Sequence, residues 1–214
     1  MDKVIKLAIV DDSDFFRKGL VSLLQANNNF QIIIESSNGQ ELIDVLKSGK
    51  HEPDIILLDL EMPVMGGTEA AQYLSKHYPK IKILVLTIHN EESIVRNLIT
   101  KVNGFLAKDK SIDKVIDAVN VVHQHDFYFA GLDFKKIMAD KKPASVSEID
   151  FTKRELEVFK LICQQYTNKK ISDKLFISIR TVHGHRTKIL KKTKTRNAAE
   201  LILYAMKHNL ITPY

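Results

Sequence analysis

Five polar residues among the first 125 are of types that could act together on a phosphoryl group. Asp11 and Asp12 follow one short apolar run, Asp59 closes another, and Thr87 and Lys108 follow two later ones. Clustered carboxylates repel one another unless a cation lies between them, and their oxygens suit Mg²⁺. A metal ion and an ammonium group can neutralise the oxygens of a phosphoryl group on a carboxylate, while a threonine donates a hydrogen bond. The set therefore indicates a site that holds a phosphoryl group.

The elements that must position these residues are short apolar runs that alternate with helical stretches. The runs end at Val10, Ile34, Leu60, Leu86 and Ala107. Continuous apolar runs of this length are typical of strands buried on both faces of a parallel sheet. Five strands alternating with five helices predict an open α/β domain, whose ligands bind at the carboxyl ends of the strands.

Charge divides the 214-residue chain, which has the length of two domains. Residues 1–125 carry 14 basic and 17 acidic residues, whereas residues 126–214 carry 18 basic and 9 acidic ones. The segment 180–196 holds seven basic residues and no acidic one. This excess of positive charge indicates binding to nucleic acid or another anionic surface, and a solvated Lys-rich helix face is the alternative interpretation.

Composition excludes several other classes of protein. The single Cys163 argues against a disulfide framework and against a Cys-based zinc site. No apolar run approaches the ~20 residues of a membrane span, and the N-terminus lacks the pattern of a secretory signal. We therefore expect a soluble, cytoplasmic protein without a membrane partner.

The region from Phe151 onward has the periodicity of short helices. Thr152 and Glu155 form a capping box, Asn168 and Ser178 are expected to cap a second and a third helix, and a fourth is expected over 197–208. Two short helices joined by a tight turn, the second of them basic, are typical of a helix-turn-helix.

The basic third helix has one face that could enter the major groove of DNA. With Val182 and Ile189 turned inward, the opposite face carries polar and basic residues, and His185 falls near the inward stripe. Lys and Arg side chains would contact phosphates, and His183 and Thr187 could reach base edges. We expect the DNA contacts to come from Lys169, Arg180, Thr181, His183, Gly184, Arg186, Thr187, Lys188 and Lys191.

The first 125 residues resemble the receiver domain of response regulators. The matching motifs are Val10-Asp11-Asp12, Leu57–Pro63 with Gly66-Gly67, Thr87, and Gly104–Lys108. The resemblance implies a flavodoxin-like sheet and phosphorylation of Asp59 by a sensor histidine kinase. It also implies Mg²⁺ ligation by Asp11, Asp12, Asp59 and Glu61, phosphoryl binding by Thr87 and Lys108, and a switch role for Phe105. We further hypothesise that Glu61, Ile88 and His89 tune the lifetime of the phosphoryl group.

The C-terminal region resembles the LuxR-type helix-turn-helix domain. The matching segments are 151–155, 168–175, 177–186 and 189–193. The resemblance implies four helices, a recognition helix near residues 179–192, and a last helix that pairs with a second copy of the chain. We expect this pairing surface to come from Leu201, Ile202, Ala205 and Met206, although one side of this set must also serve the core. Such a protein would bind double-stranded DNA and would form a homodimer when phosphorylated or on DNA.

Together these features are similar to a NarL/LuxR-type response regulator, a transcription regulator rather than an enzyme. The expected domains are a receiver at 1–125, a linker with a possible docking helix at 126–147, and the DNA-binding domain at 148–214. Two alternatives remain open. One is an orphan regulator that binds DNA without phosphorylation. The other is a haloacid-dehalogenase-like phosphohydrolase, which would need an Asp where Glu61 stands.

Overall fold

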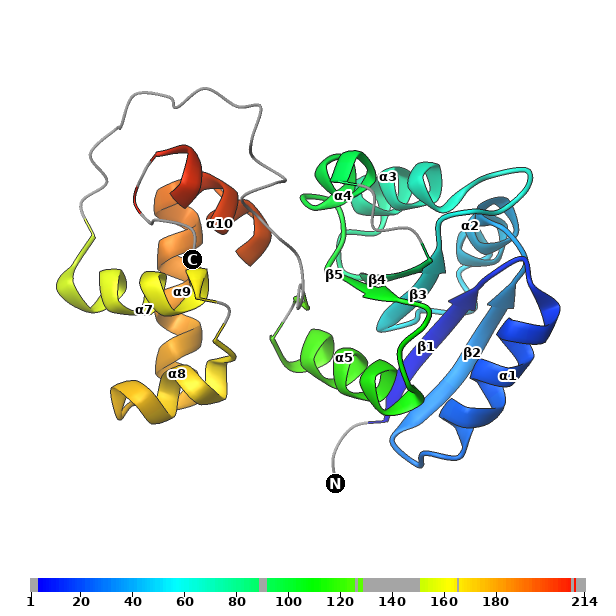
Figure 1. The fold of residues 1–214 in the computed structure, drawn as a ribbon, viewed down its shortest axis with the longest axis horizontal. Coiled ribbons are helices and arrows are strands. Elements are labelled where there is room, and N and C mark those ends of the chain that lie inside the picture. The colour runs from blue at the N-terminus through cyan, green and yellow to red at the C-terminus, as the bar shows by residue number, and fades with distance from the viewer. Residues whose placement is uncertain are drawn as a thin grey trace. The chain divides into compact units, whose positions relative to one another are not determined.

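The computed structural model describes residues 4–88, 92–125, 127–128, 151–164, 166–208 and 210. The chain divides into two compact units, residues 1–128 and 129–214 (Figure 1). The expected docking helix within 126–147 lies outside the described residues, apart from positions 127 and 128. Among the described residues, none of the helices has the length and apolar character needed to cross a membrane.

The first unit is a parallel five-stranded sheet, as the sequence predicts. The strands are β1 (Ile5–Val10), β2 (Phe30–Ser36), β3 (Ile55–Asp59), β4 (Lys82–Thr87) and β5 (Gly104–Ala107), and their order across the sheet is β2-β1-β3-β4-β5. In register, Val10 pairs with Leu58, and Asp59 pairs with Leu86. The carboxyl ends of β1, β3 and β4 therefore lie side by side, where an open α/β sheet binds its ligands.

Five helices connect the strands and cover both faces of the sheet. They are α1 (Asp14–Gln25), α2 (Gly39–Lys47), α3 (Gly67–His77), α4 (Glu92–Leu98) and α5 (Ile112–His125). Helices α1 and α5 pack together on one face, and α2, α3 and α4 lie along the other (Figure 1). Leu24, Val119 and Val122 are fully buried in the core under α1 and α5.

The chain returns to the edge of the sheet directly after α5. The backbone N–H of Tyr128 donates to the carbonyl of Asn103 at 2.7 Å, and the N–H of Phe105 donates to the carbonyl of Tyr128 at 3.0 Å. A Cβ atom on Gly104 would lie 2.5 Å from the Tyr128 carbonyl oxygen and 2.9 Å from Leu84 Cδ1. Only glycine lets the two segments approach this closely, so Gly104 is required for the edge contact.

The second unit consists of short helices around the longest one. They are α7 (Lys153–Cys163), α8 (Asn168–Leu175), α9 (Ile179–Thr193) and α10 (Ala198–Lys207), and α7, α8 and α10 all pack against α9. The capping box of Thr152 and Glu155 and the cap at Ser178 form as predicted. The second cap differs from the prediction, because Thr167 caps α8 and Asn168 is its first residue.

The residues expected to form a pairing surface on the last helix also differ from the prediction, because most of them are buried. Leu201, Ile202 and Ala205 are at most 2% exposed and belong to the core of this unit, because α10 turns them toward α7 and α9. The side chain of Met206 lies outside the described residues. The three buried residues therefore offer no surface to a second copy of the chain.

Candidate functional site

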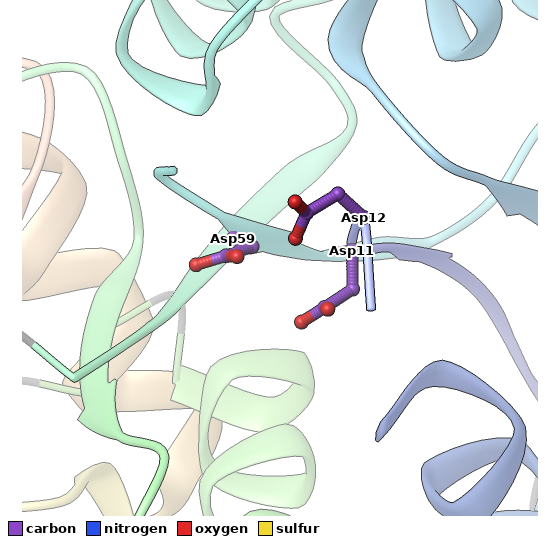
Figure 2. A group of neighbouring side chains, drawn as sticks. All are labelled: Asp11, Asp12 and Asp59. Carbon is purple, nitrogen blue, oxygen red and sulfur yellow. The ribbon is translucent and has the colours of Figure 1, made fainter. Parts of the chain in front are cut away.

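The three acids gather at the carboxyl ends of β1 and β3, as Figure 2 shows. Asp11, Asp12 and Asp59 each offer a carboxylate oxygen, and these oxygens all lie within 4.8 Å of one another. Asp11 and Asp59 are 2% and 5% exposed, whereas Asp12 is open to solvent. Two buried carboxylates thus lie beside an exposed one, so the cluster can be reached from outside.

Lys108 brings a positive charge into this cluster from the residue after β5. Its Nζ lies 2.7 Å from Asp11 Oδ2 and 2.8 Å from Asp59 Oδ2, with only 14% of the side chain exposed. The ring of Phe16, at the start of α1, lies below the ammonium group with its centroid 4.8 Å away. This cation–π contact favours one position of the charge. Sequence reasoning missed this contact, because Phe16 and Lys108 are 92 positions apart in the chain.

Burial and the charges of the cluster together shift the pKa values of two groups. Burial raises the pKa of Asp59, and the hydrogen bond and charge of Lys108 oppose this shift without overcoming it. Burial alone would lower the pKa of Lys108, but its hydrogen bonds to Asp11 and Asp59 and their charges outweigh burial and raise it. Lys108 is therefore firmly cationic, and Asp59 is a more basic carboxylate than one in water.

The loop after β3 holds Asp59 through close backbone packing. The backbone N–H of Leu60 donates to Asp59 Oδ1 at 2.8 Å, and the N–H of Gly67 donates to the Leu60 carbonyl at 3.0 Å. A Cβ atom on Gly67 would lie 1.9 Å from the Asp59 carbonyl oxygen, so no larger residue fits there. Glu61 lies in this loop with its side chain exposed.

The remaining residues of the expected site lie on the neighbouring strands. Thr87 ends β4 and is 2% exposed, and the backbone N–H of Lys108 donates to its carbonyl at 3.0 Å. Phe105 lies in β5 and is 3% exposed, so its ring is turned into the fold. Ile88 is 67% exposed, and His89 lies outside the described residues.

The acidic pocket has the donor set of a divalent-cation site. Its ligands are carboxylate oxygens, which hard cations such as Mg²⁺ prefer, and they converge within the spread of one coordination sphere. Lys108 compensates Asp11 and Asp59 from one side, while exposed Asp12 leaves an open approach. The residues present therefore fit a hydrated magnesium ion.

The second unit presents an exposed polar face along α9. Most of the expected DNA-contacting residues are exposed, and the Cβ of an alanine at Gly184 would meet nothing within 4 Å. No internal packing therefore explains Gly184. The exposed members of the expected set are Lys169, Arg180, Thr181, His183, Gly184, Thr187, Lys188 and Lys191.

Arg186 differs from the expectation for this face. It is 6% exposed, and its guanidinium donates to Asn168 Oδ1 at 2.9 Å, because its position on α9 turns it toward α8. Lys192 is likewise engaged inside the unit, where its Nζ lies 2.6 Å from Glu155 Oε2. The exposed charge of α9 is therefore smaller than its basic composition indicates.

Two known families match the two units. Residues 7–120 match the response regulator receiver domain, and residues 150–205 match the bacterial regulatory proteins of the luxR family. Together the matches cover most of the chain in the predicted order.

Known proteins also match the chain over nearly its whole length. The transcriptional regulatory protein DegU of Brevibacillus brevis is 30% identical, over 97% of this chain and 95% of its own length. The response regulator VraR of Staphylococcus aureus is 34% identical, over 97% and 99%. A structure of the RcsB response regulator of Salmonella typhimurium has the same fold, with a TM-score of 0.55, 21% identity, and coverage of 96% and 99%.

Proposed function

This chain belongs to the response regulators that join a receiver domain to a LuxR-type DNA-binding domain, and we propose that Asp59 is its phosphoacceptor. Members of this family are transcription regulators and not classic enzymes. The observation that carries the proposal is the position of Lys108, whose ammonium group lies 2.8 Å from Asp59 Oδ2. A buried carboxylate with a cation against one oxygen can accept a phosphoryl group and keep its added charge compensated.

The proposed donor is a phosphohistidine on a sensor histidine kinase. A carboxylate oxygen of Asp59 attacks phosphorus, the P–O bond forms as the P–N bond breaks, and the leaving imidazole nitrogen takes up a proton. Lys108 then binds a phosphoryl oxygen, and Thr87 on the adjacent strand donates a hydrogen bond to another. The phosphoryl group carries about −1.5 to −2 charges, in place of the single negative charge of the free Asp59 carboxylate.

The proposed cofactor is Mg²⁺, held by Asp11, Asp12, Asp59 and the backbone carbonyl of Glu61. When bound, it would neutralise charge on the phosphoryl oxygens. Exposed Asp12 leaves this side of the pocket open to the donor. Lys108 balances the other side, so the protein groups already compensate part of the acidic charge without the ion.

We propose that the protein regulates transcription by binding double-stranded DNA and that it acts in the cytoplasm. Thr87 would move toward the phosphoryl group, and Phe105, now buried, would rotate into the vacated space and alter the surface of the receiver. This change would either release the DNA-binding unit or let it pair with that of a second copy, giving a homodimer. Exposed Arg180 and Lys191 would contact phosphates, whereas buried Arg186 would support α9 from inside.

The test measures size and DNA affinity of the full chain, with and without acetyl phosphate and Mg²⁺. The proposal expects a donor-dependent shift to dimer with tighter DNA binding. Equal DNA binding in both states would favour the orphan regulator instead. Replacing Arg180 or Lys191 by Ala is expected to weaken DNA binding and reduce the salt dependence by about one unit of slope each. Lys153→Ala, at the exposed start of α7, is the matched control.

A further inference from the structure

Asn168 joins the recognition helix to the helix before it through two side-chain contacts. It is the first residue of α8 and is completely buried. Its Nδ2 lies 3.2 Å from Nε2 of His183, and its Oδ1 accepts a hydrogen bond from Arg186 Nη1 at 2.9 Å. His183 and Arg186 both belong to α9, so one buried amide contacts an exposed and a buried residue of the same helix.

The chemistry of the three groups leaves one arrangement of hydrogens. A guanidinium group only donates hydrogen bonds, so the amide oxygen of Asn168 must face Arg186. The amide nitrogen, which also only donates, must then face His183 Nε2. That nitrogen must accept, and therefore carries no proton. A neutral imidazole has one protonated nitrogen, which in His183 is consequently Nδ1.

We propose that Asn168 is a positioning residue that fixes His183 in the Nδ1–H form, so that His183 reads a hydrogen-bond acceptor on DNA. This inference rests on the proposed DNA-binding function. His183 is exposed, and within the described part of the chain its Nδ1 makes no hydrogen bond. The neighbouring Gly184 adds no side chain at this point of α9. The ring therefore presents a single N–H donor to another molecule.

A donor at this position selects among the base pairs of the major groove. Acceptors there are N7 and O6 of guanine, N7 of adenine and O4 of thymine, whereas the exocyclic amine of cytosine is a donor. A half-site position contacted by His183 should therefore favour an acceptor and disfavour cytosine on the contacted strand. We expect the affinity for a site with an acceptor at this position to be about tenfold higher than for a site with cytosine there. This is the size typical of one well-placed hydrogen bond to a base edge.

The tautomer itself can be measured without DNA. Nitrogen-15 multiple-bond NMR spectra of the full chain, labelled at histidine and recorded near pH 8, distinguish a protonated Nδ1 from a protonated Nε2. The inference expects Nδ1–H for His183. In Asn168→Asp the carboxylate still accepts from Arg186 but can no longer donate, so the proton should move to Nε2. His185, on the same helix, is the internal control and should keep its pattern.

A wild-type spectrum with the proton of His183 on Nε2 would overturn the inference, whether or not the variant folds. The second measurement selects preferred sites from randomised DNA. Asn168→Asp should reverse the preference at one position of the half-site, from an acceptor toward a donor. His183→Ala should remove the preference at the same position. An unchanged site in both variants would contradict the inference.

These two measurements separate the inference from the function on which it rests. If the chain binds DNA but His183 carries its proton on Nε2, the inference fails and the proposed function stands. If the proton is on Nδ1 but no DNA is bound under any phosphorylation condition, the proposed function fails, and with it the reading of bases by His183. The NMR result depends only on the protein, so the two failures cannot be confused.

Discussion

The ammonium group of Lys108 lies 2.8 Å from Asp59 Oδ2, although the two residues are 49 positions apart in the chain and lie at the ends of different strands, Asp59 as the last residue of β3 and Lys108 directly after β5. The same ammonium lies 2.7 Å from Asp11 Oδ2. One cation thus compensates two buried carboxylates that would otherwise repel each other. This relationship is the basis of the account, because a phosphoryl group on Asp59 would place its new charge beside Lys108.

Replacing Lys108 by Met is expected to slow the phosphorylation of Asp59 by roughly 10- to 100-fold. The charge that develops on the phosphoryl oxygens would lose a preorganised partner in a partly buried site. The measurement is the rate of phosphoprotein formation with acetyl phosphate and Mg²⁺. Lys110→Met is the matched control, because Lys110 is exposed and pairs only loosely with Asp109 at 3.3 Å. Equal rates in both variants would show that Lys108 does not act on the phosphoryl group.

The Asp59→Asn variant is expected to be more stable than the wild type at neutral pH. Because the pKa of Asp59 is raised in the folded state, the folded chain binds this proton more tightly than the unfolded chain. Stability conferred by that proton is therefore lost as the pH rises from the ordinary pKa of 3.8 through the raised one. The asparagine side chain is neutral at every pH, so the variant does not lose this stability as the pH rises.

Urea unfolding at several pH values measures this difference. The two proteins should approach equal stability below pH 3.8, and the variant should gain as the pH rises. A variant that is less stable at pH 7 would mean that the ion pair with Lys108 outweighs the cost of burial, contrary to the direction stated above.

Replacing Gly104 by Ala is expected to lower the free energy of unfolding by about 1–3 kcal/mol. The added methyl group would clash with the carbonyl of Tyr128 and with Leu84, as overpacking does elsewhere. Gly19→Ala is the matched control, because a Cβ there meets nothing within 4 Å and Gly19 lies inside α1. That change should raise stability by roughly 0.5–1 kcal/mol. Thermal unfolding of both variants tests the contrast, and similar effects would refute it.

The contact between Lys192 and Glu155 is expected to stabilise the second unit by about 1 kcal/mol. The hydrogen bond from Lys192 lowers the pKa of Glu155, with a further contribution from the backbone of Thr152. This stability is present above the ordinary pKa of 4.5 and is lost as the pH falls through the lowered one. Lys192→Met should therefore destabilise the unit at pH 7, and its free energy of unfolding should fall less steeply as the pH is lowered. Lys188→Met, on the exposed face, should change neither.

The sequence predicts the strands well because each is a continuous apolar run that ends at a polar residue. Asp59 and Lys108 could be assigned to one edge from strand order alone, since parallel strands present the same end to a ligand. The capping box of Thr152 and Glu155 could also be predicted from the sequence, because its two residues are three positions apart. In each case the signal is local, or it follows from the topology of the sheet.

Contacts between distant elements could not be predicted in the same way. Asn168 is 15 residues from His183 and 18 from Arg186, and Glu155 is 37 from Lys192. The helical period does place Arg186 beside the inward residues Val182 and Ile189, but its partner Asn168 on α8 could not be predicted from that period. The start of α3 also depends on a contact between elements, because the helix begins at Gly67, which lies directly against the Asp59 carbonyl.

The measurement that decides whether Asp59 is the phosphoacceptor is the location of the phosphoryl group. The full chain is treated with acetyl phosphate and Mg²⁺, reduced with borohydride to convert an acyl phosphate into homoserine, and mapped by mass spectrometry. Homoserine is expected at position 59 of the wild type, and none is expected in Asp59→Asn. Conversion at another carboxylate, or none at all while the fold is intact, would contradict it.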